Sequence, residues 1–378
     1  MQKRFALKLI ATCAILTGAA ASFGQDVIKI ANIVELSGGG ASAGTNFKNG
    51  VELAVKEINA AGGVLGKKIQ TATSDTQTNP GVAKGLTQKA VDDEVFAIFG
   101  PVFSGSIMVS MAESRKAEVP NFTGGEAASI TAQGNPYVFR TSFGQSTSFP
   151  KVARYITGKA KTLAVIYVNN DFGKGGRDAI TKLLEGSPTK IVADISTDAG
   201  QVDFSAAVLK AKQSNADALF VYTNEEESAR ALRELRKQGW TKPIIGETTL
   251  TGQKVIELAG DAANGAVAHV GLTVDAPQFK SFSTKFQQEY KYLSDHNGIK
   301  GYTGVYILKA AIEKAGKLDR KAVAAALKNA SFSVKQNPGL LLDVAFDDKG
   351  DMDRESFMVE VKNGHQVVVE TLPALGKK

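Results

Sequence analysis

The sequence predicts an α/β protein built from two sets of strands and helices. Apolar runs of strand length alternate with amphipathic stretches of helix length from residue 26 to about residue 274. This alternation is typical of βαβ units, which form parallel sheets covered by helices on both faces. The chain has 378 residues, which is too long for one ordinary core and suits two domains.

The first set ends near residue 142. Its expected strands cover residues 26–34, 68–74, 96–99, 119–122 and 137–142. Three helices are expected between them, and the first carries Phe47, Val51, Ala54 and Ile58 on one face. The other two helices cover residues 83–91 and 107–117.

The second set has the same alternation but no detectable sequence repeat of the first. Its expected strands cover residues 163–168, 190–195, 218–222, 243–246 and 266–270, and one of its helices covers 226–238. Beyond residue 274 the pattern becomes helical, at 279–293, 304–314 and 320–328. From residue 340 onward, turns at 347–350 and Asn363-Gly364 indicate strands.

Residues 1–24 have the pattern of a secretory signal peptide. Lys3, Arg4 and Lys8 precede the apolar run 9–21, and small residues precede an expected cut before Gln25. That run is shorter than the roughly 20 residues that a membrane span needs. We therefore expect an exported, periplasmic protein. The only cysteine, Cys13, lies in this segment, so the mature chain has no thiol for a disulfide or a metal.

The remaining sequence favours neither nucleic-acid binding nor catalysis. Removal of three basic residues with the signal lowers the net charge from +7 to +4, and no dense Lys/Arg run remains. The three histidines, His269, His296 and His365, have no metal-ligand spacing, and no catalytic constellation is found. We expect no cofactor, no metal and no enzymatic activity.

A glycine-rich segment after the first strand is a near match to a dinucleotide fingerprint. Gly38-x-Gly40-x-x-Ala43 has the glycines, but the acid expected about 20 residues later is missing. We interpret the segment as a loop that shapes the mouth of a ligand site.

Residues 96–126 contain the strongest candidate for that site. The strand at 96–99 leads to Ser104-Gly105-Ser106 at a helix start, and the next strand leads to Thr123-Gly124-Gly125-Glu126. Both loops leave the carboxyl edge of a parallel sheet, where ligands bind in open α/β sheets. Exposed amides at a helix start, together with hydroxyl groups, suit a small carboxylate.

Several segments together resemble the branched-chain amino acid (Leu/Ile/Val-binding) family of type I periplasmic substrate-binding proteins of ABC transporters. The resemblance covers nearly all of the mature chain. It rests on segments 28–38, 54–63 (AVKEINAAGG), 99–104, 140–141, 171–175 (DFGKG), 203–205 and 346–351 (FDDKGD), in this order and spacing.

The resemblance implies two doubly wound parallel-sheet lobes joined by a three-strand hinge. Lobe 1 would comprise residues 26–141 and 273–338, and lobe 2 residues 142–272 and 339–378. Relatives bind a ligand between the lobes, holding its carboxylate and amino group on lobe 1 and adding aromatic rings and an acid from lobe 2. The ligand-binding residues implied here are Phe103, Ser104, Thr123, Gly125, Ala127, Phe172, Asn224, Glu247, Thr248 and Tyr302.

Within this set, each residue has an expected role. Ser104 matches the carboxylate-binding serine, and Phe172 matches an aromatic residue without its hydroxyl. Glu247 lies one place before the expected acid, where Thr248 stands, and we assign it to the ligand's ammonium group. Tyr302 would supply a hydrophobic wall.

The resulting functional prediction is a monomeric, exported protein that binds a small amino acid and delivers it to a membrane ABC permease. One alternative is a binding protein for an aromatic or other organic acid without an ammonium group. A second alternative is a sensory module of the same fold.

Overall fold

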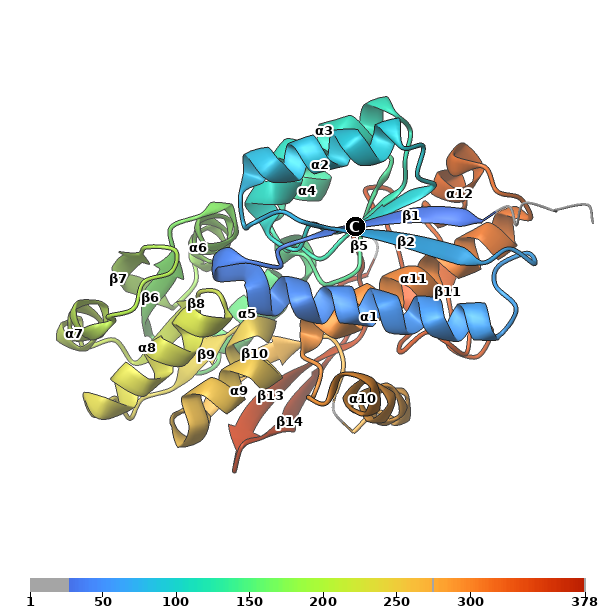
Figure 1. The fold of residues 1–378 in the computed structure, drawn as a ribbon. Helices are drawn as coiled ribbons and strands as arrows, with labels where there is room; N and C mark the ends of the chain where they lie inside the picture. Colours follow the sequence, from blue (N-terminus) through green and yellow to red (C-terminus); the bar gives the residue numbers. More distant parts are fainter. Residues whose placement is uncertain (1–26, 274, 377–378) are drawn as a thin grey trace, which may run out of the picture.

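The computed structural model describes residues 27–273 and 275–376 and has two α/β lobes side by side (Figure 1). One lobe is built on a five-stranded sheet and the other on a seven-stranded sheet, with a small two-stranded sheet besides. The signal-peptide prediction falls outside the described residues. Within them, none of the helices has both the length and the apolar character needed to cross a bilayer.

The first lobe has a parallel sheet with strand order β2-β1-β3-β4-β5. Its strands are β1 (Ile28–Val34), β2 (Ile69–Asp75), β3 (Ala97–Phe99), β4 (Asn121–Thr123) and β5 (Val138–Arg140). Its helices are α1 (Ala41–Ala60), α2 (Pro80–Asp92), α3 (Ser104–Lys116), α4 (Ser129–Ala132), α10 (Pro277–Tyr290), α11 (His296–Ala315) and α12 (Arg320–Leu327).

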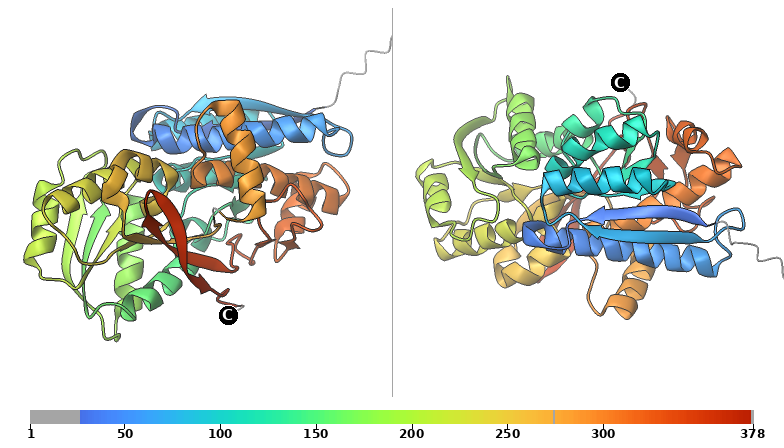
Figure 2. Two further views of the ribbon diagram at one scale, coloured as in Figure 1. Left: turned by 90° about the horizontal axis from the view of Figure 1, so that it is seen from below. Right: turned by 45° about the horizontal axis from the view of Figure 1, so that its top comes forward.

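Both faces of this sheet are covered. Alternate residues of β1 belong to different core clusters, because side chains alternate along a strand: Ile30 packs with α1 and α11, and Ile33 packs with α2. Figure 2 shows α1 on one side of the strands and α2 with α3 on the other. Burial on both faces explains why β1 is apolar at nearly every position.

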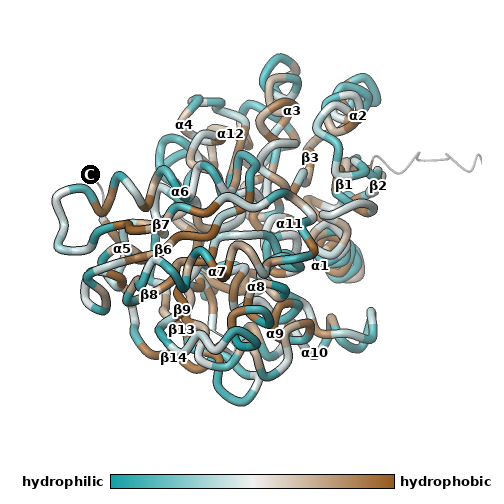
Figure 3. Tube along the Cα trace, turned by 90° about the vertical axis from the view of Figure 1, so that its left-hand side faces the viewer, coloured by the Kyte–Doolittle hydropathy of each residue, from teal (hydrophilic) through white to brown (hydrophobic). Residues whose placement is uncertain are grey.

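The second lobe has strand order β14-β13-β10-β9-β8-β6-β7. The parallel strands are β6 (Thr162–Val168), β7 (Lys190–Thr197), β8 (Ala218–Tyr222), β9 (Ile244–Gly246) and β10 (Ala266–Val270). Helices α5 (Gln145–Thr157), α6 (Asp171–Leu184), α7 (Ser205–Gln213), α8 (Glu225–Lys237) and α9 (Gln253–Ala259) cover it. Hydrophobic residues concentrate on its central strands, and hydrophilic residues on the outer loops (Figure 3).

A C-terminal hairpin extends this second sheet. Strand β13 (Ser356–Lys362) pairs antiparallel with β10 and with β14 (His365–Leu372). Asn363 and Gly364 have φ values of +51° and +75°, as a two-residue type I′ turn requires. The expected turn at Asn363-Gly364 is therefore confirmed.

The chain crosses between the lobes three times. The crossings follow β5, follow β10 and precede β13. The third one differs from the expected boundary at residue 338, because residues 340–352 still pack in the core of the first lobe. There β11 (Ser331–Phe332) pairs with β12 (Val344–Ala345), and Phe346 contacts Phe139 at a ring-centroid distance of 5.8 Å. The crossing therefore lies at residues 353–355.

Helix α11 is longer than predicted and lies against α1 at very short range. It begins eight residues before the expected start at Gly304, because Gly298 and Gly301 interrupt the apolar pattern without breaking the helix. A Cβ on Gly50 would lie 2.0 Å from the Gly298 carbonyl oxygen, and one on Gly301 would lie 2.2 Å from that of Phe47. The missing side chains allow the two helix backbones to touch.

We expect Gly50→Ala to lower the free energy of unfolding by roughly 1–3 kcal/mol, because the added methyl group forces α1 and α11 apart. The matched control is Gly85→Ala in α2, where a Cβ meets no atom within 4 Å. That change should instead stabilise the protein by roughly 0.5–1 kcal/mol, as alanine does in an open helical position. Urea unfolding of both variants measures the difference, and equal effects would contradict the close-packing argument.

Candidate ligand-binding site

A cavity of about 290 Å³ lies between the lobes, at the carboxyl ends of the parallel strands. The first lobe supplies the start of α3 and the loop after β4, and the second lobe supplies the starts of α6 and α8. The predicted position of the site at the sheet edge agrees with this cavity. Its volume is near the lower end of the roughly 300–1,000 Å³ typical of small-molecule pockets.

Ser104 presents a hydroxyl group at the first residue of α3. Phe103, rather than Ser104, is the N-cap residue of this helix. The Ser104 oxygen accepts a hydrogen bond from the Ala127 amide at 3.2 Å, so its hydrogen remains available for a ligand in the cavity. The first-turn amides of α3 have no partner within the helix, as at any helix start.

Glu35 fixes the backbone just before the start of α3. Its carboxylate accepts the amide hydrogens of Val102 and Phe103, at 3.1 Å each. Glu35 is fully buried, and burial raises the pKa of its carboxyl group above the usual value. The loop between β3 and α3 is thus held by a group at the end of β1.

The second ligand-facing loop, residues 124–127, is held by Arg140. The guanidinium group donates to the Gly125 carbonyl, to the Ala127 carbonyl at 3.0 Å and to the Asp351 carboxylate at 2.6 Å. Burial opposes ionisation of Asp351, but Arg140 and two hydroxyl groups outweigh it and lower the pKa of that carboxyl. Both charges are buried, and their pairing fixes the loop.

The opposite wall comes from the second lobe. The Phe172 ring stacks on Tyr222 at a centroid distance of 4.1 Å. Gln145 donates to the Phe172 carbonyl at 2.9 Å and accepts from the Ala128 amide of the first lobe at 3.1 Å. Gln145 therefore links the two walls of the cavity.

The first turn of α11 also faces the cavity, which the sequence analysis missed. Lys300 pairs with Glu126 at 2.8 Å and donates to the Gly124 carbonyl at 3.1 Å. Asn297 donates to Glu225 of the second lobe at 2.9 Å. The only local signal was Asp295, which caps the helix by accepting from the Asn297 and Gly298 amides.

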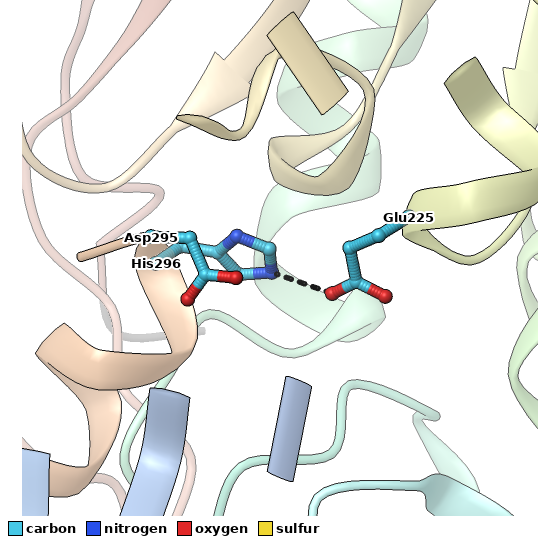
Figure 4. Close-up of side chains that lie close together, drawn as sticks. All are labelled: Glu225, Asp295 and His296. Atoms are coloured by element: carbon cyan, nitrogen blue, oxygen red, sulfur yellow. Dashed lines mark ion pairs between the residues drawn. The ribbon is translucent and has the colours of Figure 1, made fainter. Parts of the chain in front are cut away.

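Glu225, Asp295 and His296 lie close together at this turn (Figure 4). One ligand-type atom of each lies within 4.8 Å of the others, and His296 Nε2 lies 3.7 Å from Glu225. Two acids and an imidazole at such distances can surround a single positive charge, which can be a metal ion or an organic ammonium group.

Buried acids outnumber cations at this end of the cavity. Burial, reinforced by Asp295, raises the pKa of Glu225 to about 7. Burial likewise raises the pKa of Asp295 to about 6. It also raises the pKa of Glu126, against the influence of Lys300. Burial lowers the pKa of His296 well below its usual value, so the ring is neutral and Lys300 is the cation that faces these three acids.

The lobes are close together in this arrangement. The hydrogen bond from Asn297 to Glu225 joins them directly. At the opposite rim, a Cβ on Gly105 would lie only 2.9 Å from the Asp171 carboxylate. The structure therefore has its interlobe cleft closed.

Five of the predicted site residues line the cavity: Phe103, Ser104, Gly125, Phe172 and Asn224. Thr123 and Ala127 lie buried behind the lining, and the Thr123 hydroxyl has no hydrogen-bond partner among the residues that the structure describes. Thr248 lines a different cavity.

Glu247 does not line the cavity, in contrast to the role assigned to it. Its carboxylate lies 2.6 Å from His269 Nδ1 and accepts from the Thr248 amide. Burial opposes its ionisation, but His269 and the Thr248 amide lower the pKa of Glu247 below the usual value. Glu225, the first residue of α8, lies at the cavity instead.

Tyr302 does not form a wall of the cavity either. Its ring packs against Phe282 at 4.9 Å, and its hydroxyl donates to Glu57 at 2.6 Å. The physical reason is the early start of α11, whose first turn faces the cavity while Tyr302 faces α1 and α10.

A family model for periplasmic binding proteins matches residues 27–366. This chain belongs to the periplasmic binding protein family. Members of this family are solute-binding proteins, which agrees with a closed cavity between two lobes.

Relatives of this periplasmic binding protein bind amino acids according to their names. It is 27% identical over 356 residues to the leucine-, isoleucine-, valine-, threonine- and alanine-binding protein of Pseudomonas aeruginosa, covering 93% of this chain and 94% of that protein. It is 29% identical over 357 residues to a Leu/Ile/Val-binding protein of Rhizobium johnstonii, covering 93% and 96%.

Solved structures of the same fold carry two kinds of ligand. The Streptococcus pneumoniae branched-chain amino acid transporter substrate binding protein LivJ, in complex with isoleucine, matches with a TM-score of 0.81 and 27% identity, covering 92% of this chain and 99% of that chain. A solute binding protein of an ABC transporter from R. palustris, in complex with benzoate, matches with a TM-score of 0.84 at 22% identity, covering 93% and 98%. The second match shows the fold alone.

We expect Glu247→Gln to lower the free energy of unfolding at neutral pH by roughly 1–3 kcal/mol, because the buried His269 loses a charged partner. The folded-state pKa of Glu247 is lowered. Ionised Glu247 therefore stabilises the folded protein at pH values above the usual carboxyl pKa, and this stabilisation is lost as the pH falls. The deficit should therefore shrink below about pH 4.5. Glu257→Gln, on the exposed side of α9, is the control. Urea unfolding at several pH values measures both, and an unchanged stability of Glu247→Gln would contradict the pairing.

Proposed function

We propose that this protein is the exported binding component of an ABC importer, and that it closes on a small amino acid, branched-chain or similar, and delivers it to the permease. The observation that carries this proposal is the polarity of the cavity. Hydrogen-bond donors stand at its α3 end and surplus buried carboxylates at its α11 end, which matches the two charged groups of an amino acid.

The carboxylate of the ligand would bind at the start of α3. The Ser104 hydroxyl and the first-turn amides all donate hydrogen bonds, and the helix dipole favours negative charge there. Glu35 keeps the preceding amides occupied, so the next amides along the chain are the ones left for a ligand.

The ammonium group would bind near Glu225. Glu225, Asp295 and Glu126 are three buried acids beside the cation Lys300. A buried carboxylate without a partner is costly, and the ligand's ammonium group would supply the missing positive charge. Glu225 therefore takes the role that the sequence analysis gave to Glu247.

The side chain of the ligand would face apolar groups. Phe103, Ala43, Ala199 and Phe172 line the same cavity, and its volume of about 290 Å³ limits the ligand to a small one. These features favour a small aliphatic amino acid.

The proposal that the protein is exported, delivers its ligand and catalyses no reaction is supported by its family and by its sequence. Residues 1–24 have the composition of a signal peptide, and the proteins it resembles are periplasmic binding proteins. Contacts to both lobes would shift an equilibrium between open and closed forms, and this is sufficient for capture and release by a monomer. A plain organic acid is the alternative ligand, and it would leave Glu225 without a partner.

We expect Ser104→Ala to weaken leucine, isoleucine or valine binding by roughly 5- to 150-fold, equivalent to 1–3 kcal/mol, because a buried carboxylate oxygen loses its donor. Isothermal titration of the mature chain measures the change. Ser110→Ala in the same helix is the control, since that hydroxyl bonds to the Ile107 carbonyl. Unchanged affinity in Ser104→Ala would remove Ser104 from the site.

We expect leucine affinity to rise with pH between 5 and 8. The pKa of Glu225 is about 7, so below that pH a proton competes with the ligand's ammonium group for the Glu225 carboxylate. The other titratable groups that face Glu225 are Asp295, His296 and Lys300. Affinity should change by up to about tenfold per pH unit below pH 7. The stability of the ligand-free protein should depend on pH in the opposite direction to leucine affinity. Because the folded-state pKa of Glu225 is raised, the free energy of unfolding should fall as the pH rises through 7.

Two measurements check this pH dependence. In Glu225→Gln, leucine affinity should fall and lose most of its pH dependence, and the ligand-free protein should gain stability at pH 8. Glu226→Gln, the more exposed neighbour, should behave as the parent protein does. An equal loss of leucine and benzoate binding in Glu225→Gln, or pH-independent leucine binding by the parent, would reject the ammonium role.

A further inference from the structure

A second cavity, of about 250 Å³, lies against the three interlobe crossings. Phe143 comes from the first crossing, Leu272 from the second and Arg354 from the third. It shares three lining residues with the ligand cavity, namely Glu126, His296 and Lys300. These side chains form a common wall between the two spaces.

Both lobes contribute to the body of this second cavity, which is mainly apolar. The first lobe supplies Phe279, Leu293 and Ile299, and the second lobe supplies Gly252 and Ile256. Any molecule that fills the cavity therefore contacts both lobes and all three crossings at once.

Arg354 brings an unpaired positive charge to this apolar space. Its Nε atom is buried and has no hydrogen-bond partner among residues 27–273 and 275–376, and one terminal nitrogen donates to the Gly271 carbonyl. Among the described residues it forms no ion pair within 4.0 Å, and its guanidinium lies 5.2 Å from the Phe143 ring centroid. Burial lowers the pKa of Arg354 to about 10, although the charges of Asp343 and Glu355 act in the opposite direction. The group is therefore charged at neutral pH, and neither of these acids forms a direct ion pair with it.

His296 supplies a second unpartnered polar atom to the same cavity. Its Nδ1 atom is buried and forms no hydrogen bond within the described part of the chain. It lies close to Gly252, where a Cβ would approach it to 3.2 Å. Its other nitrogen, Nε2, faces Glu225 at 3.7 Å (Figure 4). The ring thus has one nitrogen toward each cavity.

We propose that this second cavity is a binding site for a small carboxylate with an apolar body, with Arg354 as the partner of the carboxylate. The remaining charged groups of the lining fix the orientation. Asp295 and the Lys300–Glu126 pair lie at the α11 end, so an anion is favoured only at the Arg354 end. A fixed guanidinium donor is well suited to carboxylate.

Occupation of this site should be coupled to the ligand cavity. The second cavity exists in the closed arrangement, and its occupant holds both lobes and the crossings in that arrangement. A molecule that binds one of two states preferentially shifts the population toward it. The carboxylate should therefore raise affinity for the amino acid, and the amino acid should raise affinity for the carboxylate by the same factor.

The test uses the full mature chain with hexanoate as the probe and hexanamide as its uncharged counterpart. Two variants change the second cavity: Arg354→Gln removes the charge, and Ser283→Phe fills the space from α10. Ser281→Phe places the same ring on the exposed side of that helix and is the control. Ser104→Ala changes the first cavity alone, so it separates this site from the proposed amino acid site.

Titration calorimetry should show hexanoate binding to the parent, to Ser281→Phe and to Ser104→Ala with similar affinity. Hexanamide, Arg354→Gln and Ser283→Phe should each weaken binding by about tenfold or more, as loss of a charged hydrogen bond does. If Arg354→Gln does not fold, the hexanoate affinity of Ser283→Phe decides whether the second cavity is the binding site. No hexanoate binding by the parent, equal binding of hexanamide, or loss of binding only in Ser104→Ala would overturn the proposal.

A leucine titration with and without saturating hexanoate measures the coupling. Tighter leucine binding in the parent, absent in Ser283→Phe, supports it. Unchanged leucine affinity would overturn the coupling. Failure of leucine itself to bind would count against the amino acid site and not against the hexanoate site.

Discussion

The buried ion pair between Arg140 and Asp351 is the contact on which the binding architecture depends. Arg140 ends β5, and Asp351 lies just before the third crossing, 211 residues later. The same guanidinium holds the carbonyls of Gly125 and Ala127, and Ala127 in turn donates to Ser104. One buried cation therefore ties the ligand-facing loop, the helix start beside it and the returning chain into one unit. Removing one partner of such a pair leaves an uncompensated buried charge.

Around the ligand cavity, closure of the lobes brings polar and charged groups together. The interlobe contacts near the cavity are polar, through Gln145, Asn297 and Glu225, and polar contacts can be exchanged for water when the lobes separate. The apolar cores remain within each lobe. This division between firm lobes and an interface that can be rehydrated is what a protein needs in order to capture and release a solute.

Much of the fold was predictable because strand and helix patterns are local. The alternating segments, the Asn363-Gly364 turn and Ser104 at a sheet-edge loop follow from residues adjacent in sequence. The sequence did not point to the first turn of α11, because this turn follows the second crossing and comes next to the other cavity residues only in the folded structure. The sequence could not show that Glu225 takes the place expected for Glu247: the Glu247 carboxylate pairs with His269, whereas Glu225 lies at the cavity and accepts a hydrogen bond from Asn297. Both outcomes depend on tertiary pairings.

The interleaved order of the lobes has a consequence for biosynthesis. The core of the first lobe contains residues from Ile28 to Met352, so it cannot be completed until nearly the whole polypeptide has left the ribosome. Contacts between such distant residues make folding slow. For the export proposed above, slow folding would keep the precursor unfolded while it passes through a translocation channel, so the architecture itself would delay compaction until the chain is across the membrane.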